Sequence, residues 1–277
     1  MKCYGGEVMP ELPEVETVKN VLKKDLINLK VIDVNIYYHD MIKTNNLENI
    51  KEEEFLDIKR LGKWLIFETT NYYLVSHLRM EGKYFYTKDG LKTKHDHIIF
   101  KLSNNYYLKY NDVRKFGVMY LVSKDKLFLD TPLKELGLEP FSKELTPNYL
   151  LNKLKLKKNS IKTCLLDQSI ITGIGNIYAD EILFKSHIYP LKKAYLLNYN
   201  NCLDIINNTN EILTEAIKYK GTTIKSYTSS LGVYGSYQDK LLVHTKSVCP
   251  VCKEKLVITK VSGRTTYLCP KCQVKDE

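Results

Sequence analysis

The sequence predicts an α+β protein: an N-terminal β-sandwich domain preceded by a helix, a helical C-terminal domain, and a small four-cysteine metal module. Three observations predict this class. Helical periodicity at the start gives way to short strand-like runs, helical periodicity returns in the second half, and paired cysteines close the chain. A chain of 277 residues is somewhat long for one average domain, so two domains and a small module are expected.

The first helix is predicted from Pro13 to about Leu26. Apolar side chains recur there at helical spacing, at Val15, Val18, Val21, Leu22 and Leu26. A proline at the start and acidic residues in the first turn, Glu14 and Glu16, are typical of a helix N-terminus.

Strands dominate the region between Val31 and Val122, where short runs rich in Ile, Val, Tyr and Phe are broken by Asn, Gly and Asp. The clearest runs are Lys63–Thr69, Tyr72–His77, His97–Leu102 and Tyr106–Tyr110. This pattern predicts a β-sandwich, and we assign residues 9–130 to the N-terminal domain and 131–146 to a linker.

Helices return after the linker, in a domain that we assign to residues 147–238. They are predicted at Pro147–Lys157, Lys162–Asp167 and Tyr178–His187, and from about Asn200 to Tyr219. Gly221 ends the last helix, and the polar stretch 222–238, rich in Ser, Gly and Tyr, is predicted to be a mobile loop.

The charge balance favours a polyanionic partner. Lys and Arg total 42 against 32 Asp and Glu, a net charge of +10, although ribosomal and membrane-surface proteins show the same excess. No stretch approaches the length of an apolar membrane span, and the N-terminus lacks an apolar signal core. We therefore expect a cytosolic protein without a membrane partner.

Four of the seven cysteines form a metal pattern in residues 239–277. Cys249-Pro-Val-Cys252 and Cys269-Pro-Lys-Cys272 are 16 residues apart, whereas Cys3, Cys164 and Cys202 stand alone. This spacing predicts a zinc ribbon that holds one structural Zn²⁺ and leaves no open coordination position. Two hairpin strands, Lys255–Lys260 and Thr265–Leu268, are expected between the pairs, with Gly263 and Arg264 at the turn. The alternative is four buried structural thiols.

Several motifs carry a family resemblance over nearly the whole chain. They are Met9-Pro-Glu-Leu-Pro-Glu-Val-Glu-Thr17, Gly62-Lys-Trp64, His77-Leu-Arg-Met-Glu-Gly82, Lys94-His-Asp-His97, Asp112-Val-Arg-Lys-Phe-Gly117 and Gly173-Ile-Gly-Asn-Ile-Tyr-Ala-Asp-Glu181. Together with the ribbon, they fall in the order seen in formamidopyrimidine-DNA glycosylases, which this chain resembles. The segment Val243-His-Thr-Lys246 departs from the Tyr-Gly-Arg-like segment common in that family, which puts local ribbon packing in doubt.

The resemblance implies a bacterial base-excision repair enzyme that removes oxidised purines, 8-oxoguanine and formamidopyrimidines, from duplex DNA and then nicks the strand at the abasic site. An N-terminal proline is a secondary amine that can attack the C1′ carbon of a deoxyribose, so Pro10 is the expected nucleophile and Glu11 the expected proton donor. The simpler interpretation is that Pro10 and Glu11 only open a helix.

Eight residues, Met1 to Val8, precede Met9 and depart from the family pattern. If they remain attached, the Pro10 nitrogen is an amide and cannot act as the nucleophile. We expect that they are never made, because the codons of Gly5, Gly6 and Glu7 can spell a ribosome-binding sequence before Met9. Met1 is then a misassigned start.

Further site residues follow from the resemblance. Lys63 and Arg264 would assist catalysis. Met80, Arg114 and Phe116 would fill the helix when the damaged nucleotide flips out. His95, Lys157 and Asn176 would contact DNA, and the glycine-punctuated turn before residue 176 resembles a helix-two-turns-helix, with residues 222–238 as a lesion-capping loop. A metal at His95 and His97 is not expected, because further ligands are missing. The basic run Lys153, Lys155, Lys157, Lys158 and Lys162 precedes this turn; such a run is usually a solvated helix face.

Two other functions stay open. One is the sister branch that excises oxidised pyrimidines. The other is a protein that binds lesions or nucleic acid without catalysis, which retention of residues 1–8 would create. The expected enzyme is a monomer that acts on DNA in the bacterial cytoplasm and is associated with the nucleoid through that DNA.

Overall fold

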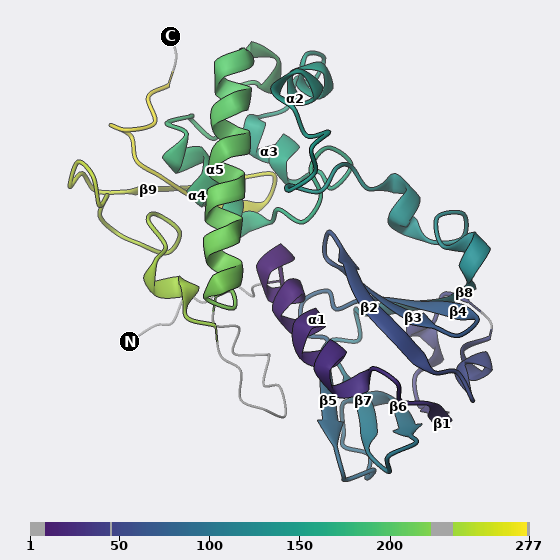
Figure 1. Cartoon of the computed structure of the whole chain (residues 1–277). Coiled ribbons are helices and arrows are strands. Elements are labelled where there is room, and N and C mark those ends of the chain that lie inside the picture. Colours follow the sequence, from purple (N-terminus) through teal and green to yellow (C-terminus); the bar gives the residue numbers. More distant parts are fainter. Residues whose placement is uncertain (1–8, 45, 223–234, 276–277) are drawn as a thin grey trace. The chain divides into compact units, whose positions relative to one another are not determined.

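The computed structural model describes residues 9–44, 46–222 and 235–275 (Figure 1). The chain divides into two compact units. Among the described residues, the first unit comprises those from 9 to 134 together with Thr222 and Gly235, and the second comprises 135–221 and 236–275. The α+β class is confirmed, because one unit is built around strands and the other around helices and a cysteine hairpin.

The first unit opens with helix α1, Leu12–Leu26, as the periodicity predicts. The side chains of Leu12, Val15, Val18, Leu22 and Leu26 are all buried. Their spacing of three and four residues places them on one helix face. This face packs mainly against strand β2, whereas lysines in the last turn complement the helix dipole.

Two four-stranded antiparallel sheets follow α1. One has the order β2-β3-β4-β8 and the other β1-β6-β7-β5. The first sheet contains β2 (Phe55–Leu61), β3 (Trp64–Thr69), β4 (Tyr72–His77) and β8 (Val118–Ser123). The second contains β1 (Val31–Ile36), β5 (Lys83–Thr87), β6 (Asp96–Leu102) and β7 (Tyr107–Asn111). The predicted strands are therefore confirmed, with boundaries that differ by at most one residue.

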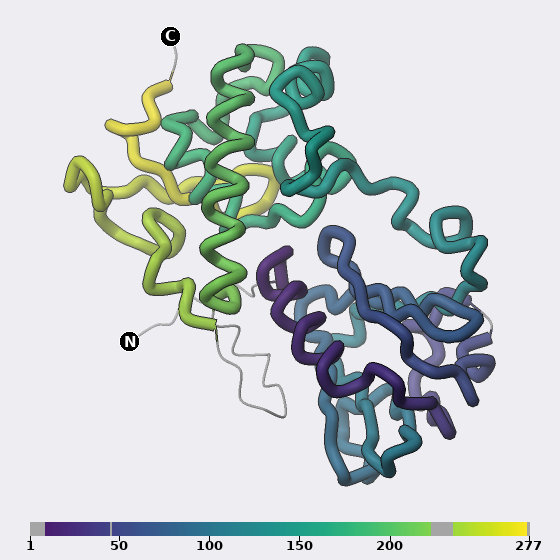
Figure 2. Tube along the Cα trace, viewed as in Figure 1, coloured from purple at the N-terminus to yellow at the C-terminus, as the bar shows by residue number. Residues whose placement is uncertain are grey.

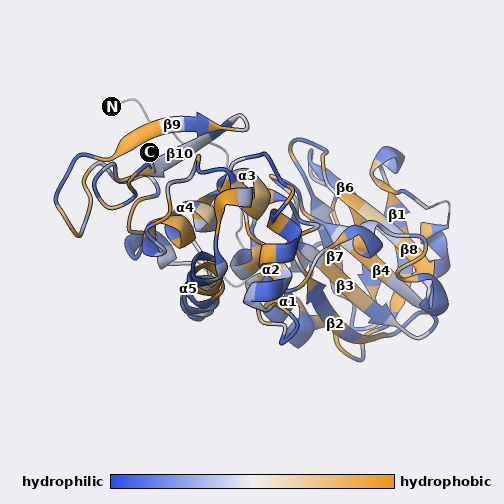
Figure 3. Ribbon diagram, turned by 90° about the horizontal axis from the view of Figure 1, so that it is seen from above, coloured by the Kyte–Doolittle hydropathy of each residue, from blue (hydrophilic) through white to orange (hydrophobic). Residues whose placement is uncertain are grey.

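The main hydrophobic core of this unit joins both sheets and α1. Phe67 of β3, Phe100 of β6 and Tyr110 of β7 belong to one buried cluster with Leu22 of α1. Figure 3 shows apolar residues, in orange, along the strands of both sheets. The two sheets therefore form a sandwich, and the loops at the strand ends remain available to carry functional side chains.

The second unit is helical. Its helices are α2 (Pro147–Leu154), α3 (Ile161–Leu166), α4 (Asn176–Lys185) and α5 (Tyr199–Lys218). The long helix α5, green in Figure 2, packs against both α2 and α4. Thr146, Ser160 and Asn198 cap α2, α3 and α5 by accepting backbone N–H groups, which explains why each helix begins there. Gly221 adopts a φ of 77°, and its N–H donates to the Ala216 carbonyl, which ends α5 as predicted.

A hairpin of β9 (Val257–Val261) and β10 (Arg264–Leu268) completes the second unit and contacts α4 through β10. The turn is formed by Ser262 and Gly263, both at positive φ. Arg264 is thus the first residue of β10, paired with Val261, and the predicted turn position of Arg264 was wrong by one residue. Within the described ranges, no helix is both long enough and apolar enough to cross a bilayer.

Candidate active site and nucleic-acid interface

Pro10 and Glu11 lie buried at the start of α1. Glu11 is the N-cap residue, with only 2% of its surface exposed, and its N–H donates to Glu14 Oε2 at 3.0 Å. The other oxygen of Glu14 accepts from the backbone N–H of Thr222 at 2.8 Å and from its hydroxyl at 3.1 Å. Pro10 and Glu11 therefore do open a helix, and the Glu14 carboxylate holds the start of that helix in a fixed position.

Lys63 lies in the turn between β2 and β3 and is 8% exposed. It is therefore not an ordinary exposed lysine at a strand edge. Gly62 makes the turn at a φ of 57°, and Arg60 Nη1 donates to the Gly62 carbonyl at 2.9 Å. Arg60 Nε also donates to Glu16 of α1 at 2.9 Å. This side-chain link fixes the turn that carries Lys63 to the helix that begins after Pro10.

His77 at the end of β4 is a residue that sequence reasoning treated only as part of a motif. It pairs across the sheet with Trp64, and their rings meet edge to face at 4.6 Å. Burial, aided by the positive charges of Arg79 and Lys63, lowers the pKa of His77 to about 3. The imidazole is therefore neutral, and its Nδ1 accepts the Arg79 N–H at 2.9 Å. Its position at the start of the motif His77–Gly82 was the available signal.

Met80 lies in the loop that follows His77 and is partly exposed. Arg79 reaches this loop at a φ of 54°, a conformation that L-residues seldom adopt, and the Gly82 N–H closes the turn on the Leu78 carbonyl at 3.0 Å. The bond from His77 to the Arg79 N–H fixes the entry to the loop. Met80 is thus presented on a tight turn and is not one of the fully buried core residues.

Arg114 and Phe116 share the loop between β7 and β8. The Asp112 carboxylate accepts the Arg114 N–H at 2.9 Å and the Gly117 N–H at 2.8 Å. These two hydrogen bonds hold both ends of the loop. The Arg114 guanidinium carbon lies 4.7 Å from the centre of the Phe116 ring. Phe116 is 50% exposed and therefore does not belong to the core.

His95 and His97 both contact Asp112, which precedes the loop of Arg114 and Phe116. The His95 carbonyl accepts the Asp112 N–H at 3.0 Å, and His97 Nε2 lies 2.8 Å from the Asp112 carbonyl. His97 is 4% exposed, whereas His95 is partly exposed. His95 thus lies beside the loop of Arg114 and Phe116 and is itself partly exposed.

Asn176, Lys157 and Arg264 belong to the second unit. Asn176 is the first residue of α4, and its Nδ2 donates to the Thr265 carbonyl of β10 at 3.0 Å. This bond places Asn176 next to Arg264, whose side chain is exposed. Lys157 follows α2, is 42% exposed and lies 3.6 Å from the Asp167 carboxylate. Helix α4 presents its positive N-terminal end at Asn176.

Lys162 differs from the rest of the basic run, because it is not part of a solvated face. It is fully buried, and its Nζ donates to Asp180 Oδ1 at 2.6 Å and to Thr266 Oγ1 at 2.8 Å. Asp180 Oδ2 lies 2.8 Å from His244 Nδ1, and Glu181 accepts three backbone N–H groups from residues 242–244. The unusual segment around His244 is therefore fully engaged in packing the hairpin onto α4.

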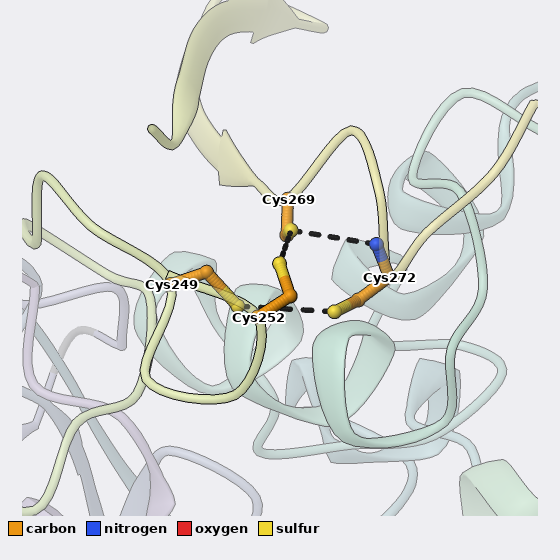
Figure 4. Close-up of side chains that lie close together, drawn as sticks. All are labelled: Cys249, Cys252, Cys269 and Cys272. Carbon is orange, nitrogen blue, oxygen red and sulfur yellow. Dashed lines mark hydrogen bonds between the residues drawn. The ribbon is translucent and has the colours of Figure 1, made fainter. Parts of the chain in front are cut away.

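The four paired cysteines converge, as the spacing predicts (Figure 4). Their sulfur atoms all lie within 4.8 Å of one another, with Cys249–Cys272 at 3.8 Å and Cys252–Cys269 at 3.4 Å. Four thiolates about 2.3 Å from a tetrahedral Zn²⁺ would be separated by about 3.8 Å, so the donor set fits this ion. The alternative of four structural thiols without metal does not account for this convergence.

Three family models match consecutive parts of the chain. The formamidopyrimidine-DNA glycosylase N-terminal domain matches residues 9–119, the H2TH domain of the same enzymes matches 136–228, and the zinc finger found in FPG and IleRS matches 246–274. The last match agrees with the convergence of the four cysteines, so this module is a zinc finger with one structural ion.

Curated relatives and solved structures agree with these models. Formamidopyrimidine-DNA glycosylases of Lactobacillus helveticus and Oceanobacillus iheyensis are 44% and 43% identical over 274 residues, which cover 96% of this chain and 99% and 98% of theirs. A point mutant of Lactococcus lactis Fpg, solved in complex with DNA containing Fapy-dG, superposes with a TM-score of 0.90 at 38% identity. That match covers 96% of this chain and 100% of the other. The same enzyme with DNA containing an abasic site gives a TM-score of 0.89. On this sequence, this fold and this cysteine cluster, the chain belongs to the formamidopyrimidine-DNA glycosylase family.

Proposed function

We propose that this chain is a bifunctional DNA glycosylase and abasic-site lyase that excises 8-oxoguanine and formamidopyrimidines from duplex DNA. The observation that carries the proposal is the start of α1, where Pro10 and Glu11 are adjacent, buried and held by Glu14 in the unit that also carries Lys63. Relatives named formamidopyrimidine-DNA glycosylase, and a solved structure of Lactococcus lactis Fpg with DNA containing Fapy-dG, support the substrate class. Chromosomal DNA as substrate places the enzyme at the bacterial nucleoid.

The reaction begins with the Pro10 nitrogen. Its lone pair forms a bond to the C1′ carbon, while the bond from C1′ to the damaged base breaks and the base leaves with its electron pair and a proton. Glu11 donates a proton to the sugar-ring oxygen as the ring opens, which yields an iminium between Pro10 and C1′. Loss of a C2′ proton then expels the 3′ phosphate, and a second elimination expels the 5′ phosphate.

Lys63 and Arg264 assist these steps from two different positions. Lys63, held by the turn that Arg60 fixes, contacts the lesion nucleotide or its phosphate and helps proton transfer. Arg264, exposed at the start of β10 and placed next to Asn176, holds the phosphates that depart during the eliminations. Lys157, His95 and the N-terminal end of α4 contact the phosphate backbone of the same duplex.

Met80, Arg114 and Phe116 fill the helix after the lesion is extruded. Extrusion costs a few kcal/mol of stacking and pairing, and an apolar wedge with a guanidinium for the orphaned cytosine recovers part of that cost. The exposure of Phe116 and its stacking beneath Arg114 support this role. Arg114 and Phe116 lie on a loop that Asp112 holds through two backbone hydrogen bonds. They therefore need no rearrangement of the sheet to reach DNA.

The presence or absence of the eight residues before Met9 determines whether the Pro10 nitrogen is an amide or a free amine. We propose that translation begins at Met9 and that removal of this methionine frees Pro10. The match to the family's N-terminal domain begins at residue 9, which supports this start.

Borohydride trapping on an abasic duplex tests the mechanism. A protein that begins at Pro10 should give a covalent adduct, whereas one that retains Met1–Val8 should bind the duplex without an adduct. Binding without trapping by the protein that begins at Pro10 would establish a lesion-binding protein without lyase chemistry. Full activity of the longer protein would exclude Pro10 as nucleophile.

Lesion choice separates the two branches of the family. Matched duplexes with 8-oxoguanine or thymine glycol should differ in release rate, with the oxidised purine faster. Faster release of thymine glycol would move the chain to the pyrimidine branch and leave the nucleophile assignment untouched.

A further inference from the structure

Tyr110 of β7 lies beneath both loops that carry the proposed helix-filling side chains. It is fully buried, and its hydroxyl is enclosed by Gly82, which follows Met80, and by Gly117, which follows Phe116. A Cβ atom added to Gly82 would lie 2.3 Å from this hydroxyl oxygen, and one added to Gly117 would lie 1.6 Å from it. The two loops therefore rest on one phenol, and both contact points require glycine.

The Tyr110 hydroxyl has no hydrogen-bond partner among the residues that the structure describes. Its neighbour Tyr84, 5.1 Å away between ring centres, is also buried but donates to Ser76 Oγ at 2.8 Å. A buried hydroxyl without a partner destabilises a protein, and such exceptions concentrate at functional sites. A phenylalanine would fill the same space without this cost.

Acceptors lie close to the same two glycines. The position of a Gly82 Cβ is 2.5 Å from the Leu78 carbonyl, and that of a Gly117 Cβ is 3.2 Å from Asp112 Oδ2. Both oxygens already accept one backbone N–H and retain a second lone pair. A small shift of either loop would therefore give the Tyr110 hydroxyl an acceptor.

We infer that Tyr110 is a positioning residue that holds both loops at the same height above the sheet. Its hydroxyl gains a hydrogen bond when the two loops enter the DNA helix. The inference rests on the proposed role of Met80, Arg114 and Phe116. The unpaired hydroxyl raises the energy of the free state relative to the inserted state, so insertion is favoured by a bond that the free protein lacks. The phenol ring couples the two loops, because movement of one glycine against the hydroxyl displaces the other.

The substitution Tyr110→Phe tests this inference, with Tyr84→Phe as the matched control. Each change removes one hydroxyl from a buried tyrosine in the same aromatic cluster. Loop insertion is followed by stopped-flow fluorescence of 2-aminopurine placed next to an 8-oxoguanine, and stability by thermal unfolding of the free protein.

Opposite effects are expected from the two variants. Tyr110→Phe should unfold at the same temperature as the wild type or higher, yet insert about tenfold more slowly, because the new bond cannot form. Tyr84→Phe should unfold at a lower temperature, because Ser76 loses its donor, and insert at the wild-type rate.

Several results would overturn the inference. Unchanged insertion by Tyr110→Phe would remove the role of the hydroxyl, and a loss of both stability and insertion would assign Tyr110 to ordinary core packing. If the wild type itself gives no 2-aminopurine signal while Met80→Ala and Phe116→Ala excise normally, the proposed insertion fails, which is distinguishable from failure of Tyr110 alone.

Discussion

Glu11 and Glu14 are both buried carboxylates at the start of α1, and each accepts the backbone N–H of the other in a reciprocal capping box. Both oxygens of Glu14 accept from the protein, one from the Glu11 N–H and the other from Thr222. A carboxylate used in this way stabilises the helix start. Glu11 also caps the helix, but it stands directly after the proposed nucleophile, so it is the carboxylate that we propose as the proton donor.

Replacing Glu11 by Gln should abolish base excision while the fold persists. Because the amide cannot donate a proton to the sugar-ring oxygen, excision of 8-oxoguanine should fall by at least about 100-fold. Single-turnover excision and thermal unfolding measure the two effects. The matched variant Glu14→Gln should instead lower the unfolding temperature; equal losses of excision in both variants at equal stability would contradict the division of roles.

His77 should make the protein less stable in acid. Its folded pKa of about 3 lies below the usual 6.5, so the unfolded chain binds a proton that the folded protein rejects. This contribution to stability is complete above pH 6.5 and is lost as pH falls from 6.5 toward 3, by up to about 1.4 kcal/mol per pH unit. Urea unfolding between pH 7.5 and 4 measures it.

The variant His77→Asn provides the comparison, because its side-chain oxygen can accept the Arg79 N–H without titrating. Its unfolding free energy should fall less steeply below pH 6.5 than that of the wild type. His39→Asn, at an exposed histidine, should leave the slope unchanged. Parallel slopes in wild type and His77→Asn would show that this histidine does not titrate as its burial requires.

At the scale of elements, loops at strand ends and helix ends carry the proposed chemistry. Strand β4 ends at His77 and leads into the loop of Met80, whereas β7 leads into the loop of Arg114 and Phe116. In the second unit, the start of α4 and strand β10 meet through the bond from Asn176 to Thr265. Rigid strands and helices thus fix side chains that must reach DNA.

Lys157, just beyond α2, should contribute to the salt dependence of DNA binding. Each phosphate contact adds about 0.9 to the slope of log affinity against log salt, so Lys157→Ala should reduce this slope by about 0.9. Fluorescence anisotropy titrations at salt concentrations from about 50 to about 300 mM measure this slope. Lys126→Ala is the matched control, because Lys126 is similarly exposed and lies 3.8 Å from Asp130. Equal slopes in both variants would remove Lys157 from the interface.

At the scale of the whole molecule, the zinc finger and the helices behave as one structural body within the second unit. Phe184 of α4 packs in one cluster with Val243, Leu256 and two of the cysteines. Lys162 and Asp180 add a buried ion pair that reaches Thr266 of β10. A buried pair of this kind is costly to break, because either partner alone would be an uncompensated charge.

Loss of zinc should therefore remove DNA binding without unfolding the strand-rich unit. Chelation, or Cys272→Ser, releases the hairpin that carries Arg264, so affinity for an abasic duplex should fall at least tenfold. Cys272→His should restore part of the affinity, because histidine also binds Zn²⁺. Zinc content, anisotropy and limited proteolysis provide the measurements. Unaltered affinity in the zinc-free protein would show that the finger does not contribute to binding.

Local patterns in the sequence determined the order and type of the main elements. The spacing of Val15, Val18 and Leu22 predicts the buried face of α1, and the run of strand-favouring residues at 72–77 predicts β4 to the residue. The two Cys-x-x-Cys pairs predict a metal site because four thiolates at that spacing have few other uses. Each of these signals depends on neighbours within one turn, one strand or one hairpin, and needs no knowledge of the rest of the chain.

Only the tertiary structure decided which polar residues are buried and what they bond. The bond from Lys162 to Thr266 spans 104 positions and that from Thr222 to Glu14 spans 208, so no local pattern marks these side chains as internal. The same holds for the neutral state of His77 and for the enclosed hydroxyl of Tyr110. Burial and pairing depend on segments that meet only in the folded chain, which is why a single sequence cannot supply them.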